Sequence, residues 1–473
     1  MKIIKVAVFN FFWLQAILLL GATAGYGQKV NKPIISEPSL KFLSQQICEC
    51  LNKKQLEKTE SAEALKSCFE DEFTEHGEQI LSDNNLEGST EVGQQIGLLL
   101  SKELSKDCAS YVSFLAESPQ KKLINEAEAL QRAGKHEQAM NLFTKLMKTK
   151  LILIDWTIYN QRGLSKLETG DYYGALADFE YAIQRDSTGV VAYNNRGLAK
   201  YRLGDKRGAF DDFTSAIDLD STLALAYENR GVVLYDDDQY DRAKVDLLKA
   251  IALNPSSMTG YYYLGLSGKA LENYSDTTAG YFTKAIELAP VKHEYQNARG
   301  LFYNDKKDFK RARADYAAAI KLSPNYNPAF YNLAQLDLSE NKLTDALRNL
   351  DTAIRLDSTY EIYFNKKAQV LLQLKRYNEA LASCKQAIDL NPERADSYDT
   401  QGAIFDEMGD AKNAVVAYTK SLDIASQDGH IYYRRGMAKL KVKDAAGACQ
   451  DFQMGKLLKN TDASKAAQQH CNR

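Results

Sequence analysis

Cysteine and histidine are the residues of this 473-residue chain whose types could support redox, metal or nucleophilic chemistry. Seven cysteines and five histidines are present: Cys48, Cys50, Cys68, Cys108, Cys384, Cys449, Cys471, His76, His136, His293, His430 and His470. Cys48-x-Cys50 has the spacing of half a metal site, but no second paired set follows it and only His76 is near. No histidine belongs to a motif with a serine, cysteine or acid. We therefore predict no catalytic residue, no metal site and no cofactor.

Four of the cysteines lie in a segment, 28–118, that we interpret as a helical cap domain with helices at 40–53, 62–81 and 92–117. In an oxidising compartment, four cysteines more often form two disulfides than a metal site. If the first two helices form an antiparallel hairpin that turns near Lys58, Cys50 on the first helix lies opposite Cys68 on the second, and the two can form a disulfide. Cys48 would then pair with Cys108, although four cysteines allow three connectivities.

The first 27 residues indicate the cellular compartment in which the protein works. Lys2 and Lys5 precede an apolar run from Val6 to Leu20, and small residues follow around Ala24. This order is typical of a secretory signal peptide, and we expect cleavage between Ala24 and Gln28. The alternative is a retained membrane anchor, because the apolar run is long. No cysteine precedes Cys48, so the expectation is an exported periplasmic or cell-envelope protein without a lipidated cysteine and, after cleavage, without membrane insertion.

Most of the remaining chain repeats one pattern with a period of 34 residues. Gly197 recurs as Gly231, and Ala209 recurs as Ala243. Apolar residues in each unit follow helical spacing on two segments that are separated by a break such as Gly204-Asp205, so each unit predicts two helices. Nine units fit: 156–189, 190–223, 224–257, 258–292, 293–326, 327–360, 361–394, 395–428 and 429–462. A looser, degenerate unit, 120–153, precedes them.

The repeated residues resemble the signature of the tetratricopeptide repeat, in which an aromatic residue, Leu-Gly, Tyr, Ala, an aromatic residue, Ala and Pro recur in a helix-turn-helix unit. In many units of this chain an arginine replaces the leucine, which gives an "NRG" variant similar to exported bacterial members: Arg196, Arg230, Arg299 and Arg435. The resemblance implies an all-α fold, an α-solenoid of stacked helix-turn-helix repeats that winds as a right-handed superhelix after the N-terminal cap.

The same resemblance implies where a partner binds. In this family the first helices line a concave groove, and an asparagine near their start bonds the backbone of an extended peptide. Exposed tyrosines there would strengthen an interface. The alternative is that these side chains only solvate the wall of the groove. The residues expected to bind the partner are Asn160, Gln161, Asn194, Asn195, Arg202, Glu228, Asn229, Tyr262, Tyr263, Tyr331 and Asn332.

The end of the solenoid is expected to carry a short capping helix at 463–473, because the last apolar face needs a cover. If this helix folds back antiparallel to the second helix of the last unit, Cys449 and Cys471 lie opposite each other, and we expect them to form a disulfide. The alternative is that both are unpaired helix residues. Cys384 occupies the position of Phe213 in its unit, so we expect it to be buried and unpaired.

Composition and motifs favour a binding protein over other classes. The formal net charge of −2 argues against a general nucleic-acid binder. No phosphate-binding glycine motif follows a strand-like run. Our first hypothesis is a non-enzymatic exported scaffold that binds a protein or extended peptide in the groove. The alternatives are an accessory subunit of a cell-envelope glycan or secretion machine, whose cap makes the specific contact, and a hydrolytic cap on a repeat stalk.

Overall fold

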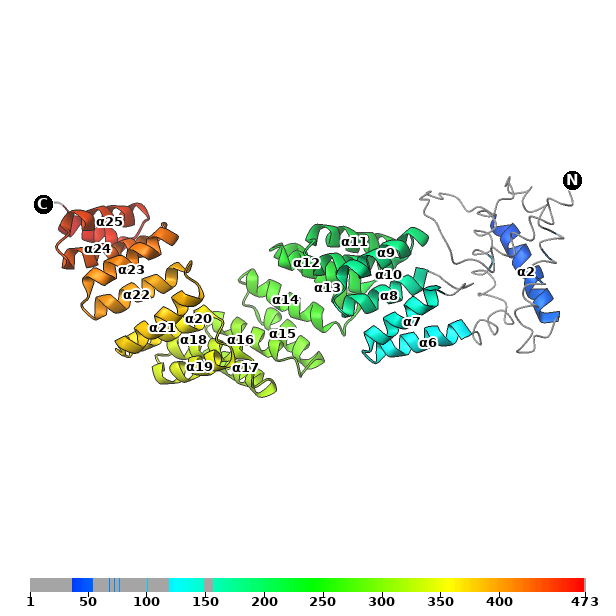
Figure 1. Cartoon of the computed structure of the whole chain (residues 1–473), viewed down its shortest axis with the longest axis horizontal. Helices are drawn as coiled ribbons and strands as arrows, with labels where there is room; N and C mark the ends of the chain where they lie inside the picture. Colours follow the sequence, from blue (N-terminus) through cyan, green and yellow to red (C-terminus); the bar gives the residue numbers. More distant parts are fainter. Residues whose placement is uncertain are drawn as a thin grey trace. The chain divides into compact units, whose positions relative to one another are not determined.

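The computed structural model describes residues 36–53, 119–148 and 156–471, together with the single helical positions Cys68, Glu72, His76 and Leu100. In these ranges the regular elements are 22 α-helices, and no strand is present among them. The predicted all-α solenoid of stacked helix pairs is therefore confirmed. The chain divides into two compact units, residues 1–238 and 239–473, and each is described by itself (Figure 1).

The first unit contains a helix of the cap segment and four repeat pairs or parts of pairs. In each repeat we call the first helix the A helix and the second the B helix. Within this unit the A helices α6, α8 and α10 pack on their own B helices, and each of these B helices packs on the next A helix (Figure 1). The elements are α2 (Glu37–Lys53), α6 (Pro119–Arg132), α7 (His136–Lys148), α8 (Trp156–Glu168), α9 (Tyr172–Arg185), α10 (Val190–Arg202), α11 (Lys206–Leu219) and α12 (Ala224–Asp236).

The second unit continues the same A–B alternation and ends in one additional helix. The repeat 224–257 supplies α12 to the first unit and α13 to the second. The elements are α13 (Tyr240–Leu253), α14 (Met258–Ala270), α15 (Asp276–Leu288), α16 (His293–Asp305), α17 (Phe309–Leu322), α18 (Asn327–Ser339), α19 (Leu343–Leu356), α20 (Glu361–Gln373), α21 (Tyr377–Leu390), α22 (Ala395–Glu407), α23 (Ala411–Ile424), α24 (Gly429–Lys441), α25 (Ala445–Leu457) and α26 (Thr461–His470).

The two ends of the chain are only partly described. Helix α2 starts three residues before the expected Leu40, whereas the expected signal peptide and most of the other two cap helices lie outside the described residues. The structure joins Cys50 to Cys68, with a Cα–Cα distance of 5.7 Å. Cys108 lies outside the described residues. The expected Cys48–Cys108 pair therefore stays a prediction.

At the C-terminus, α26 packs against both α24 and α25. It begins two residues earlier than expected, because the side chain of Asn460 caps it by accepting a hydrogen bond from the Ala463 backbone N–H at 2.7 Å. The structure joins Cys449 on α25 to Cys471 at the end of α26. The final helix is thus fixed at both of its ends.

The turn between the A and B helices explains the recurring Gly-Asp pair. Gly204 has a φ of +85°, in the left-handed region where glycine has no steric penalty. Asp205 then caps α11, because its carboxylate accepts a hydrogen bond from the Gly208 backbone N–H at 2.8 Å. In the second unit Lys307 takes the same left-handed conformation, with a φ of +64°, and Asp308 caps α17.

Close A–B packing depends on a glycine opposite an aromatic ring. A Cβ atom added to Gly197 would lie 2.8 Å from the ring of Phe213. Where alanine replaces this glycine, the residue 16 positions later is smaller: Ala334 shares a core cluster with Leu350, and Ala368 shares one with Cys384. The prediction that Cys384 is buried and unpaired is confirmed. Burial raises the pKa of its thiol to about 12.

The arginine of the "NRG" variant forms a buried ion pair with the B helix of its own repeat. Arg196 donates from Nε and Nη2 to the two carboxylate oxygens of Asp212, at 2.9 and 2.6 Å. Lys200 adds a contact of 2.8 Å to the same carboxylate, which is 3% exposed. The same arginine–aspartate–lysine set recurs as Arg162, Asp178 and Lys166 and as Arg435, Asp451 and Lys439.

The same arginine also reaches the preceding repeat. In the second unit, Arg299 on α16 donates to Asp315 on α17 and, through Nη1, to Thr283 on α15 at 3.0 Å. Arg435 repeats this contact with Thr419 at 3.2 Å. One guanidinium therefore connects three successive helices through directed hydrogen bonds. A leucine at this position has no donor and could not form them.

We expect Asp212→Ala to destabilise the protein strongly, because it leaves the Arg196 guanidinium and the Lys200 ammonium beside each other without a counter-charge. Breaking a buried pair costs about 3–5 kcal/mol, and the lower end applies here because both cations keep some contact with water. Asp211→Ala, one residue earlier and exposed on the same helix, is the matched control. Urea unfolding followed by circular dichroism measures both; equal midpoints for the two variants would contradict the assignment.

Candidate partner-binding surface

A ladder of side-chain hydrogen bonds connects successive A helices. Each rung joins the fifth residue of one A helix to the sixth residue of the next A helix, 35 positions later in the sequence. In three rungs both residues are asparagine, and the later Nδ2 donates to the earlier Oδ1. These rungs are Asn195 to Asn160 (3.0 Å) and Asn229 to Asn194 (3.0 Å) in the first unit, and Asn332 to Asn297 (2.9 Å) in the second.

The ladder places most of the asparagines that were predicted to bind a partner inside the stack. Asn160, Asn194 and Asn195 are only 5%, 2% and 6% exposed, so little of each amide reaches solvent. Asn229 and Asn332 are half-buried. The sequence analysis did not predict that these amides form hydrogen bonds with one another. The spacing could have indicated it, because the bonded asparagines are 35 residues apart, one more than the repeat length.

The last rung has the same geometry but is charged. Arg434 on α24 donates from Nη1 to both oxygens of Asp399 on α22, at 3.0 and 2.9 Å. Burial raises the pKa of the Asp399 carboxyl, and the adjacent Arg434 guanidinium opposes that increase. An Asp–Arg pair therefore occupies the place of an Asn–Asn pair.

The two rungs on either side of α20 are not formed. Lys366 is at the donor position opposite Tyr331, and its ammonium instead donates to Gln369 Oε1 on its own helix at 2.9 Å. Thr400 is at the donor position opposite Asn365, but its hydroxyl donates to the Asp396 backbone carbonyl at 2.9 Å. Asn365 is 7% exposed, and its Oδ1 has no hydrogen-bond partner.

The predicted tyrosines lie in ring clusters at the A helices. Tyr262 stacks on Tyr295 with ring centroids 4.5 Å apart and meets Tyr263 edge-on at 5.4 Å. Tyr331 lies 4.9 Å from Tyr363, and burial raises the pKa of the Tyr331 hydroxyl. Tyr262, Tyr263 and Tyr331 are half-buried, so part of each side chain remains open to solvent.

The other predicted residues of the first unit differ in exposure. Arg202 is exposed at the end of α10, whereas Gln161 and Glu228 are half-buried on α8 and α12. The backbone carbonyl of Gln161 accepts a hydrogen bond from the Gln131 side chain at 2.7 Å, which ties α8 to α6. These residues therefore line the same run of A helices without forming one compact cluster.

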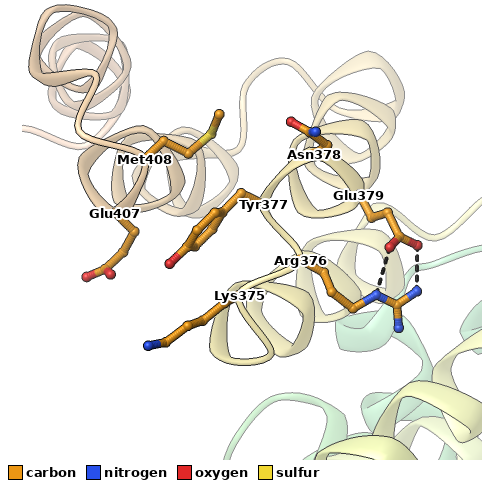
Figure 2. Close-up of a pocket in the computed structure, with 7 residues that line it drawn as sticks. All are labelled: Lys375, Arg376, Tyr377, Asn378, Glu379, Glu407 and Met408. Atoms are coloured by element: carbon orange, nitrogen blue, oxygen red, sulfur yellow. Dashed lines mark hydrogen bonds and ion pairs between the residues drawn. The ribbon is translucent and has the colours of Figure 1, made fainter.

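A shallow hollow in the second unit lies away from the ladder, at the turn between α20 and α21 and the end of α22 (Figure 2). Figure 2 shows Lys375, Tyr377 and Glu407 directed toward the same open space. Arg376 is held on one side by two hydrogen bonds to Glu379, of 2.7 and 2.6 Å. None of the residues predicted from the sequence lines this hollow, and its polar groups are exposed.

The described residues contain neither a metal-binding cluster nor a membrane-spanning helix. No group of three or more His, Cys, Asp or Glu residues there is placed to hold a metal ion. Among the same residues, no helix combines the length and apolar character that a membrane span requires.

Comparison with known families agrees with the repeat architecture. Two sequence models described as tetratricopeptide repeat match the chain, one at residues 160–224, 277–327 and 331–395 and the other at 224–257 and 395–428. Together they cover about half of the chain and coincide with the observed A–B pairs. The chain belongs to the tetratricopeptide repeat family.

Several solved structures are similar to the chain at low sequence identity. Cut9-Hcn1 of the APC/C is 11% identical, with a TM-score of 0.44, over 93% of this chain and 100% of that chain. A tetratricopeptide repeat protein from Parabacteroides merdae is 17% identical, with a TM-score of 0.42, over 53% and 98% of the two chains. Yeast Tom70 is 15% identical, with a TM-score of 0.40, over 75% and 96%. No match was found among curated proteins.

The ladder predicts a stability effect at Asn332. Asn332→Ala leaves the Oδ1 of Asn297, a side chain that is 6% exposed, without its donor. An unsatisfied buried acceptor costs about 1–3 kcal/mol. Asn378→Ala in the same unit, at an exposed position in the hollow, is the control and should change stability little. Thermal unfolding of the two variants measures the difference, and a drop no larger for Asn332→Ala than for the control would refute the ladder's role.

Proposed function

We propose that this protein is an exported scaffold that binds a protein or peptide partner on the surface formed by its A helices. Family membership supports a protein-interaction scaffold, and one observation on the first unit supports the choice of surface. Val191 on α10 and Leu225 on α12 are 46% and 49% exposed. Val191 precedes the rung residues Asn194 and Asn195 by three and four positions. Leu225 precedes the rung residue Asn229 by four, so each lies on the rung face of its helix.

An apolar pair beside polar amides has the character of a protein interface. Interfaces combine apolar contact with hydrogen-bonding groups at their margin. Exposed large apolar residues also occur on B helices of this unit, as Tyr173 and Leu219. Val191 and Leu225 differ from these in lying next to the amides of the ladder. A partner that follows successive A helices would meet Val191, Leu225 and the exposed Arg202.

The partner hypothesis is tested with a cross-linking pull-down from native cell envelopes. Val191→Asp combined with Leu225→Asp should weaken capture of the principal partner at least tenfold, because both charges lie on the proposed surface. Tyr173→Asp is the control, since Tyr173 is a 76%-exposed apolar residue on the B helix α9. Unchanged capture by the double variant would reject the A-helix surface.

Deleting residues 29–118 separates this function from its alternative. If the scaffold binds through its A helices, the deletion variant keeps the partner. Loss of the partner on deletion, with full binding by the Val191/Leu225 double variant, supports instead the accessory subunit whose cap makes the contact. The hydrolytic-cap hypothesis predicts, in addition, an activity that the deletion removes.

The exported location is supported by two features. The N-terminal 27 residues follow the order of a signal peptide, and the structure joins two cysteine pairs. Disulfides persist in oxidising compartments and are rare in the reducing cytosol.

Peptide mapping of the natively expressed protein tests this location. With thiols blocked and no reductant, we expect Cys50 linked to Cys68, Cys449 linked to Cys471, and Cys384 free. Cleavage near Ala24 to Gln28 should give a mature chain that starts with the sequence KVNKP at Lys29. The reduced and alkylated digest is the control for peptide recovery. A chain that retains Met1 and has free thiols at these four positions would count against export.

A further inference from the structure

The C-terminal helix α26 is held on the stack by a small buried surface and one disulfide. Its buried side chains are those of Ala463 and Ala466, which are 0% and 4% exposed. An alanine buries little apolar area, and an isolated helix of only 10 residues is marginal in water. The disulfide between Cys449 on α25 and Cys471 therefore contributes much of the attachment, and opening it should release α26.

The surface below α26 is apolar and depends on this cover. Phe452 on α25 is fully buried, and Tyr433 and Met437 on α24 pack on the same cluster, to which α26 contributes Ala466. The ring of His470, at the end of α26, lies 6.2 Å from the ring of Phe452. We call this cluster the α24–α25 surface. Release of α26 would expose it to water, which is unfavourable, so another helix that covers it would bind there.

The shape of the α24–α25 surface selects the helix that fits. A Cβ atom added to Gly455 would lie 2.6 Å from the Cβ atom of Ala463, so α25 and α26 approach as closely as small residues permit. A matching helix needs a small residue there and again three and four residues later, as α26 has in Ala466 and Ala467. A second copy of this chain carries that helix. We propose that two copies exchange their α26 helices once a dithiol opens the disulfide, each helix covering the α24–α25 surface of the other copy.

The connection between α25 and α26 favours exchange. The closed turn holds Lys459 at a φ of +61°, a left-handed conformation that is unfavourable for a residue with a Cβ atom. Residues 456–471 contain neither glycine nor proline, so the turn can straighten and join α25 and α26 into one continuous helix. The straightened helix carries α26 away from its own chain. Two copies that exchange an identical element form a dimer that keeps the original contacts.

The covalent steps balance by thiol–disulfide exchange. Cys449 and Cys471 are half-buried, so a small dithiol can reach the bond. One thiolate of the dithiol attacks a sulfur of the bond, and its second thiol resolves the mixed disulfide. The dithiol leaves as its own disulfide, and the protein gains two thiols. After exchange, oxidised glutathione accepts two electrons and two protons for each bond formed between Cys449 of one copy and Cys471 of the other.

The test mixes equal amounts of unlabelled and isotope-labelled full-length protein. The mixture is reduced with dithiothreitol, reoxidised with oxidised glutathione and mapped by mass spectrometry without further reduction. Exchange predicts hybrid Cys449–Cys471 pairs, in which one peptide is labelled and the other is not. Their amount should rise with protein concentration, together with a dimer measured by size-exclusion chromatography and light scattering. The mixture that is never reduced is the control and should contain no hybrid pairs.

The fit of α26 is tested at its buried face. Ala463→Leu should lower the amount of hybrid pairs at least tenfold, because a leucine does not fit against Gly455. Gln468→Leu is the matched control, since Gln468 lies on the exposed face of α26 and its replacement leaves the contact unchanged. Pairs that form by random collision of thiols would not distinguish the two variants.

The turn is tested separately with glycine. Lys459→Gly should lower the amount of hybrid pairs at least tenfold, because glycine adopts the closed turn without a steric penalty and two such turns open in each dimer. Lys443→Gly is the matched control. Lys443 has a φ of +65° in the turn between α24 and α25, so the same substitution there should leave the exchange unchanged.

Four results would overturn the exchange. They are the absence of hybrid pairs at every protein concentration, equal amounts of them in Ala463→Leu and Gln468→Leu, equal amounts in Lys459→Gly and Lys443→Gly, and a dimer that contains no hybrid pairs. None of these measurements involves capture of a partner, so they leave the proposed function to its own test.

Discussion

The buried pairing of an A-helix arginine with a B-helix aspartate is the contact that fixes the helix register in the four repeats that contain it. Charges of this kind are costly to remove from water, and their attraction offsets that cost only when both partners are well placed. Asp212 meets Arg196 through two directed hydrogen bonds and Lys200 through a third contact. Apolar packing alone allows helices to slide, whereas this arrangement fixes the register of the A helix on the B helix.

The central part of the second unit uses a different solution. Here the arginine position holds Leu333, Lys367 or Gln401. Asp337 on α18 is instead paired with Arg313 from the preceding α17, at 2.7 Å, and accepts a hydrogen bond from Asn349. The A–A ladder changes over the same helices, where the two rungs of α20 are not formed. Both the A–B ion pairs and the A–A ladder are therefore altered over the same helices of this unit.

Much of the architecture follows from the sequence, because the period identifies equivalent residues. It predicts the helix pairs, the turn at Gly204-Asp205 and the core position of Cys384, since each depends on local pattern or on volume. It does not predict which equivalent residues bond one another. The rungs join positions 35 apart, one more than the period, and only the stacked geometry brings Asn160 beside Asn195. From the sequence, the asparagines were therefore predicted to bind a ligand. In the structure, most of their amide groups form hydrogen bonds with one another.

The ladder also determines how freely whole repeats could be lost or duplicated. Each repeat carries one half of two different rungs, so its removal joins halves that were never adjacent. Loss of 190–223 would place Asn229 opposite Asn160, and an amide pair would form again. Loss of 395–428 would place Arg434 opposite Asn365 and remove its aspartate. The unit 190–223 could therefore be lost in a gene rearrangement without breaking the ladder, whereas loss of 395–428 would leave Arg434 without its counter-charge.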